Sequence, residues 1–291
     1  MAFNIATFRT RTLTAAVFVV VMLAGLLIDT WPFFLLFSVV HFGAWFEYQK
    51  LVGLIDPGYS KISWVHRYSV QLLGWLLMIY FINYYPEKLI ISLKDTFPIA
   101  SFVIVLFLLL YELIIHKPRQ PKNTAHSLFG LVYISLSLAL LFDLRTRFNY
   151  DMEREFWNKA LPLGLICSIW VNDTMAYIVG SLIGKTPFSK ISPKKTWEGT
   201  LGGIILCIVV ITLVFGVWLK IFTVKDWIAI SSIAAIAGTA GDLLESKLKR
   251  LANVKDSGHI MPGHGGFLDR FDSLLVAVPF VWIYVVLFGE W

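Results

Sequence analysis

Apolar residues occur along the chain in nine stretches, each with roughly the 17 to 25 residues that a helix needs to cross about 30 Å of hydrocarbon. Only Asp29 and Thr30 separate the first two stretches, which predicts a tight helical hairpin. The pattern predicts an all-α integral membrane protein with about nine transmembrane helices, at residues 12–28, 31–48, 68–85, 97–115, 126–142, 160–183, 200–220, 227–244 and 273–289.

The composition agrees with a bilayer as the main solvent. Of the 291 residues, 57% are hydrophobic and 15% are charged, whereas soluble domains carry roughly 25% charged residues. The first stretch follows Arg9 and Arg11 but lacks a small-x-small cleavage pattern, and another apolar stretch follows directly. We therefore expect a retained span and not a secretory signal peptide.

The distribution of Lys and Arg predicts the orientation in the membrane. With the N-terminus in the cytoplasm, 17 of the 25 basic residues fall on the inner side, which favours a cytoplasmic N-terminus and an outer C-terminus. The two most polar connections, 184–199 and 245–272, then face the cytoplasm, where nucleotides are found. Orientation and contact with anionic head groups explain the net charge of +6, so we expect no nucleic-acid partner.

The chain shows no internal repeat, low-complexity tract or Gly/Ser linker, so we expect one polytopic membrane domain over residues 1–291. Within it, residues 1–150 are expected to be N-terminal scaffold and lipid-facing helices, and residues 160–291 the catalytic half. Cys167 and Cys207 lie in apolar stretches without metal or disulfide spacing, and we expect them to be inert packing residues.

Two acidic residues within predicted spans stand out, because an acidic side chain there costs about 2.5 to 3.5 kcal/mol and usually faces a polar cavity. Asp173 is midway through the sixth span, and Asp242 is towards the inner end of the eighth. Alternatively, Asp173 forms a buried polar pair with Asn172, and Asp242 marks a helix end that emerges into water. We favour the cavity for both.

Two further carboxylates, Asp269 and Asp272, are three residues apart at the entry to the last span and so share one helical face. With Asp242, they offer the hard oxygen ligands that suit Mg²⁺, which also shares phosphate oxygens of substrates. We predict a Mg²⁺ site with these three ligands and with Asp173 in support. A second, monovalent cation beside Mg²⁺ is an open alternative.

The connection 184–199 carries four lysines, and Lys194 and Lys195 follow Ser192 closely. Charge that orients the protein and contacts lipid head groups is the simpler explanation of these lysines. The functional alternative is a clamp in which ammonium groups and loop amides neutralise a triphosphate.

The connection 245–272 offers further groups that suit phosphate. Lys249 and Arg250 are basic, and Gly265 and Gly266 belong to a glycine-rich loop whose amides can approach an anion closely. His264 lies in the same loop without HExxH or His-rich spacing, so we assign it to phosphate contact and not to zinc.

These polar motifs resemble the signature of the phosphatidate cytidylyltransferase family, also called CDP-diacylglycerol synthases. The resemblance covers roughly residues 165–272, while the first five spans resemble the family in hydropathy alone. Met175 and Met261 depart from residues that are common in the family, but both exchanges are apolar. The matching blocks are Asn172-Asp173-Thr174, then Ser192-Pro193-Lys194-Lys195-Thr196-Trp197-Glu198-Gly199, then Ser246 to Arg250, Lys255-Asp256 and Pro262 to Asp272.

The resemblance implies a nucleotidyltransferase of the bacterial inner membrane that joins CTP and phosphatidic acid into CDP-diacylglycerol and pyrophosphate at the cytoplasmic face. Asp242, Asp269, Asp272 and Lys195 are then the expected catalytic residues. Lys194 and Lys195 would screen the triphosphate, and Lys249 or Arg250 the lipid phosphate. Membrane lipids and a homodimer are further partner hypotheses.

Other classes of protein share parts of the pattern. A transporter also has many spans and intramembrane carboxylates, but its site is expected at broken helices within repeated halves. A CTP-dependent polyprenol or phytol kinase would release CDP instead of pyrophosphate. A cytidylyltransferase that acts on an ether lipid is a third alternative.

Overall fold

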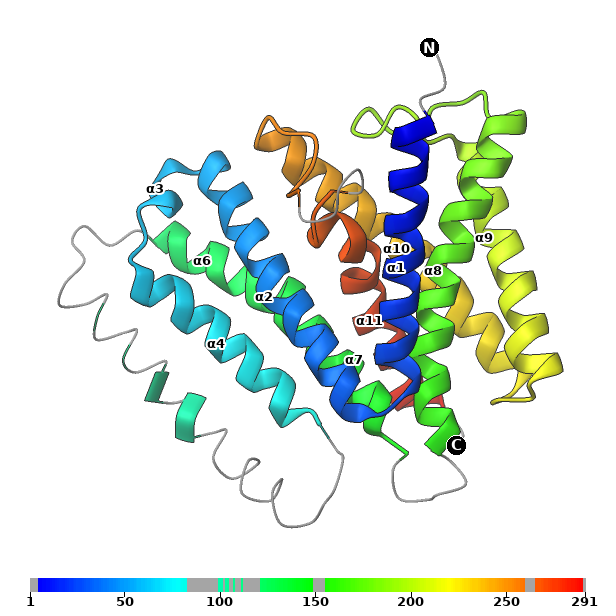
Figure 1. The fold of residues 1–291 in the computed structure, drawn as a ribbon, viewed down its shortest axis with the longest axis horizontal. Helices are drawn as coiled ribbons and strands as arrows, with labels where there is room; N and C mark the ends of the chain where they lie inside the picture. The colour runs from blue at the N-terminus through cyan, green and yellow to red at the C-terminus, as the bar shows by residue number, and fades with distance from the viewer. Residues whose placement is uncertain are drawn as a thin grey trace. The chain divides into compact units, whose positions relative to one another are not determined.

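The structure is a computed structural model that describes residues 5–82, 99–101, 103–104, 107, 111, 121–148, 155–259 and 265–289. In these residues every regular element is a helix, which confirms the all-α class (Figure 1). The helices are α1 (Ile5–Leu27), α2 (Thr30–Ile55), α3 (Pro57–Ser60), α4 (Trp64–Tyr80), α6 (Pro121–Gly130), η1 (Leu131–Leu136), α7 (Ser137–Thr146), α8 (Glu155–Ile183), α9 (Trp197–Ile211), η3 (Thr212–Trp218), α10 (Val224–Leu251) and α11 (Leu268–Phe288).

The chain divides into two compact units. The first consists of Met1–Thr146 and Leu251–Arg270, and the second of Arg147–Arg250 and Phe271–Trp291. The expected roles of residues 1–150 as scaffold and of residues 160–291 as catalytic half stay predictions.

Among the described residues, five helices are long and apolar enough to cross a membrane, which indicates a membrane protein. They match five of the nine predicted spans, whereas the apolar part of α1, Thr12–Leu27, is shorter. The predicted span 97–115 falls mostly outside the described residues, so the total of nine stays a prediction. The five helices are Pro121–Thr146, Phe156–Ile183, Trp197–Trp218, Val224–Leu251 and Leu268–Phe288.

In the first unit, α2 follows α1 closely, as the predicted hairpin requires. The Asp29 carboxylate accepts a hydrogen bond from the Thr30 amide and so caps the start of α2. The rings of Phe33 and Phe142 then meet edge to face with centroids 5.0 Å apart, both buried in the core of this unit. Aromatic burial therefore joins α2 to α7.

Three polar side chains buried in the same unit contact one another. The Ser135 hydroxyl lies 2.9 Å from the Trp45 Nε1 and 3.0 Å from the His41 Nε2, and all three side chains are buried. A Cβ atom at Gly74 would overlap both the Ser135 and His41 side chains. The glycine thus allows α4 to approach this polar group.

In the second unit, α8 and α9 pack with their backbones close together. Thr196 caps α9 by accepting a hydrogen bond from the Gly199 amide at 3.1 Å. A Cβ atom at Gly199 would stand 2.7 Å from the Ala176 backbone oxygen, and one at Gly203 would stand 2.8 Å from the Asn172 backbone oxygen. These two glycines let α9 lie directly against the polar face of α8.

The helices α10 and α11 also approach closely within the second unit. A Cβ atom at Gly241 would lie 3.0 Å from the Cα of Ser273, next to the Asp272 backbone. The helix α10 continues to Leu251, so Asp242 lies well inside it and is not a helix end that emerges into water. The connection between the helices is correspondingly shorter than the expected 245–272.

Replacing Gly203 with alanine should destabilise the second unit, because the new methyl group would stand 2.7 Å from the Cβ of Ala176. Overpacking of this kind costs about 1 to 3 kcal/mol, so we expect the Tm in detergent to fall by roughly 2 to 12 °C. Gly238→Ala is the matched control, since its methyl group would meet no atom closer than 3.4 Å. Equal Tm values for the two variants would contradict the close packing of α8 and α9.

Candidate functional site

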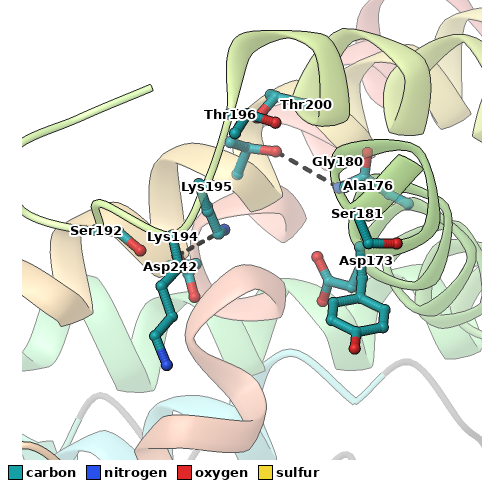
Figure 2. Close-up of a pocket in the computed structure, with 13 residues that line it drawn as sticks. Asp173, Ala176, Gly180, Ser181, Ser192, Lys194, Lys195, Thr196, Thr200 and Asp242 are labelled. Atoms are coloured by element: carbon teal, nitrogen blue, oxygen red, sulfur yellow. Dashed lines mark hydrogen bonds and ion pairs between the residues drawn. The ribbon is translucent and has the colours of Figure 1, made fainter. Parts of the chain in front are cut away.

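A cavity of about 500 Å³ lies within the second unit, between α8, α9, α10 and the connection that precedes α9 (Figure 2). Its lining is rich in hydroxyl and charged side chains, although it is built largely from helices that are apolar enough to span a membrane. The lining residues are Asn172, Asp173, Ala176, Tyr177, Gly180, Ser181, Ser192, Lys194, Lys195, Thr196, Thr200, Thr239 and Asp242.

The Glu198 carboxylate and two backbone hydrogen bonds shape the connection before α9. Glu198 accepts hydrogen bonds from the Lys185 amide at 3.2 Å and from the Thr186 amide and hydroxyl at 3.2 and 2.8 Å. The Trp197 amide donates to the Thr186 backbone oxygen at 3.0 Å and the Phe188 amide to that of Lys195 at 2.8 Å. These bonds give the lysine-bearing connection a defined shape at the cavity.

Lys195 and Asp242 form an ion pair across the cavity wall. The Lys195 Nζ lies 2.7 Å from the Asp242 Oδ2, and each side chain is 30% exposed (Figure 2). Lys194 is exposed beside them, and Ser192 lies on the same connection. The structure therefore brings together the residues that the sequence proposed for triphosphate binding and one proposed metal ligand.

Asp173 occupies the other side of the cavity. Figure 2 shows it with Ser181 on α8, facing the side that carries Lys195 and Asp242. Asp173 is exposed, whereas its neighbour Asn172 is buried and its amide nitrogen lies 3.5 Å from the Thr239 hydroxyl. Asn172 thus forms its polar contact with α10, and the Asp173 carboxylate belongs to the cavity wall.

Asp272 is the third carboxylate in this unit, after Asp173 and Asp242, that the sequence proposed for the site. It is buried on α11, accepts a hydrogen bond from the Ser273 amide at 2.7 Å, and interacts electrostatically with Asp242 and Asp173. In the part of the chain that the structure describes, no three His, Cys, Asp or Glu side chains are close enough to hold a metal ion as they stand. The Mg²⁺ ligand set stays a prediction.

Asp269, in the first unit, is engaged by its own loop. Its Oδ2 accepts hydrogen bonds from the Ser257 amide at 2.9 Å and from the Gly266 amide at 2.8 Å, and it lies 2.9 Å from the Ser257 hydroxyl oxygen. Gly265 has a φ of 83°, in the region that glycine adopts readily. In this structure the Gly266 amide that was expected to contact phosphate serves Asp269, while His264 lies outside the described residues.

The two residues that were assigned to the lipid phosphate have different surroundings. The Lys249 Nζ pairs with the fully buried Glu245 carboxylate at 2.5 Å, one helical turn away on α10. Arg250 is exposed at the end of the same helix. Arg250 is therefore the more available cation for a ligand.

Sequence reasoning missed several polar residues. Thr196, Thr200 and Ser181 line the cavity but were not proposed as site residues; Thr196 and Thr200 are four residues apart, and this spacing on one helical face was a usable signal. Glu47 was also overlooked, although it is an acidic residue within the predicted span 31–48. The cost of burial that drew attention to Asp173 applies equally to Glu47.

Comparison with known proteins places the chain in a family. It matches the cytidylyltransferase family over residues 9–288, which includes the N-terminal helices. It is 31% identical over 282 residues to the phosphatidate cytidylyltransferase of Bacillus subtilis (strain 168), covering 97% of this chain and 98% of that protein. It is 35% identical over 192 residues to the phosphatidate cytidylyltransferase of Staphylococcus saprophyticus, covering 65% of this chain and 69% of the relative. The chain belongs to the cytidylyltransferase family.

Proposed function

We propose that the protein is a phosphatidate cytidylyltransferase, which transfers CMP from CTP to phosphatidic acid and releases pyrophosphate. The observation that carries this proposal is the cavity in which Lys194 and Lys195 stand beside Asp242 within apolar helices. Such a cavity suits a polyanion that reacts at a membrane. The names of the relatives supply the two substrates.

The chemistry needs positioning and charge neutralisation more than a strong base. The phosphate monoester of phosphatidic acid is already anionic at neutral pH, and its oxygen would attack the α-phosphorus of CTP. A new P–O bond forms as the bond from the α-phosphorus to the oxygen that bridges to the β-phosphorus breaks, and pyrophosphate leaves with that oxygen. Lys194 and Lys195 would neutralise the triphosphate, and Arg250 or Lys249 the lipid phosphate.

The carboxylates of the second unit offer oxygen donors of the kind that a divalent cation prefers. Asp242 already has a cationic partner in Lys195, and Asp272 supplies a second hard oxygen donor that Asp242 affects electrostatically. We propose that these two hold Mg²⁺, with Asp173 in support, while Asp269 stays a further ligand predicted from the sequence alone. Mg²⁺ would neutralise and orient phosphate oxygens, and a monovalent cation is a second candidate.

The finer placement in the cell is also a proposal. The excess of Lys and Arg on one side supports nine spans with a cytoplasmic N-terminus and an outer C-terminus. Together with bacterial relatives, it supports a bacterial inner membrane with the active site at the cytoplasmic face. A homodimer is part of the proposal without further support from the described residues.

Detergent-purified protein should release pyrophosphate from CTP only when phosphatidic acid and Mg²⁺ are both present, and thin-layer chromatography should detect a nucleotide-bearing lipid. Removal of Mg²⁺ with EDTA should abolish the release, because the triphosphate would lose its neutralising cation. Release of CDP instead of pyrophosphate would contradict the proposal and identify a lipid kinase. Absence of any CTP binding would favour a transporter.

Asp242→Asn should lower kcat by at least about 100-fold, because it removes one charge from the site while it keeps the size and polarity of the side chain. The protein should still elute as a single species from size-exclusion chromatography. Lys225→Gln is the control, since it removes an exposed charge from the same helix away from the cavity. Near-normal turnover by Asp242→Asn would refute its role as a ligand.

A further inference from the structure

Glu47 of α2 caps a helix that begins 221 residues later in the chain. Its Oε1 accepts a hydrogen bond from the Phe267 amide and its Oε2 one from the Leu268 amide, both at 2.9 Å. Leu268 is the first residue of α11, whose first amides have no acceptor within their own helix. A carboxylate at this position also interacts favourably with the positive end of the helix dipole.

The Glu47 carboxylate also contacts Ser257, at the start of the segment 257–267 that leads into α11. The Ser257 hydroxyl lies 2.6 Å from the Glu47 Oε2, and Ser257 also contacts Asp269 through its amide and hydroxyl. Glu47 is 5% exposed and Ser257 is 2% exposed, so water contributes little to this network. Glu47 thus reaches the Asp269 carboxylate through one intervening side chain.

Three glycines let the segments around Glu47 approach one another closely. A Cβ atom at Gly258 or at Gly266 would overlap the Glu47 carboxylate, and one at Gly43 would overlap the Phe267 ring. Gly43 and Glu47 are one helical turn apart, so a single face of α2 receives both ends of the segment. Glycine at all three positions therefore permits the close approach.

We infer that Glu47 is a positioning residue for the reaction: it fixes where α11 begins and thereby the direction of Asp269 and, one turn further along the same helix, of Asp272. The inference rests on the proposed function, because it assigns importance to the two carboxylates that the sequence proposes as metal ligands. Glu47 itself lies outside the segment 165–272 that carries the motifs of the family, and it acts through Ser257 and two backbone amides.

The test compares Glu47→Gln with Lys50→Gln, an exposed neutralisation one turn away on α2. Glu47→Gln keeps an acceptor oxygen but replaces the other with an amide that cannot accept from Ser257 or Leu268. We expect kcat per folded molecule to fall about 10- to 100-fold at a temperature well below the Tm, with the KM for CTP unchanged within about twofold. Lys50→Gln should leave both constants as in the wild type.

Hydrogen exchange provides a readout that does not depend on turnover. Peptides that contain the amides of Phe267 and Leu268 should exchange at least about tenfold faster in Glu47→Gln than in the wild type, because their acceptor is weakened. Peptides from α9 should be unchanged. Unaltered exchange in the 265–270 region would refute the cap.

The outcomes separate the two proposals. Faster exchange with lower kcat and constant KM supports the positioning role, whereas faster exchange with wild-type kcat per folded molecule overturns it and leaves a structural cap.

A double variant Glu47→Gln/Ser257→Ala should lose no more activity than the stronger single variant, since both act on one network. Full additivity would contradict that network. A wild-type protein without pyrophosphate release would refute the proposed function, while exchange would still decide whether Glu47 holds α11.

Discussion

Buried charge in an apolar helical protein needs a partner, and this constraint accounts for the polar architecture of both units. Glu47 has two backbone amides and a serine hydroxyl, Glu245 has Lys249, and Asp242 has Lys195. An unpartnered carboxylate at such a position would cost several kcal/mol. Glu47 and Asp242 therefore each determine which other segment must come close to them.

The three pairings differ in what they leave available to a ligand. Glu245 is fully buried and its lysine is one turn away on the same helix, so that pair stabilises α10 locally. The Glu47 network is also buried and joins segments far apart in sequence. The pair of Lys195 and Asp242 is instead partly exposed in a cavity, and partly exposed charge is the kind that a polyanion or a cation can reach.

The long apolar runs made much of the second unit predictable, since α8 to α11 all coincide with expected spans. Asp173, Asp242, Lys194 and Lys195 were proposed from separate motifs, because charged residues in or beside apolar helices are rare enough to be informative, and they line one cavity. The surroundings of Asp269 were not predictable. Its spacing from Asp272 indicates a shared helical face, but only the folded loop shows that Ser257 and Gly266 use its carboxylate. Nothing in the local sequence marks Glu47 as their partner.

The ion pair between Lys195 and Asp242 also constrains any complex with a triphosphate. A lysine ammonium that turns towards phosphate weakens its bond to the carboxylate, and Asp242 then needs another cation or loses much of its stabilisation. Lys194 is exposed on the same connection, but its ammonium is also attracted to the added phosphates. A nucleotide that arrives together with a divalent cation would satisfy both requirements, because Asp242 would hold the cation and Lys195 would then contact the phosphate. On the proposed function, charge balance within the cavity would favour joint binding of nucleotide and metal over the binding of either alone.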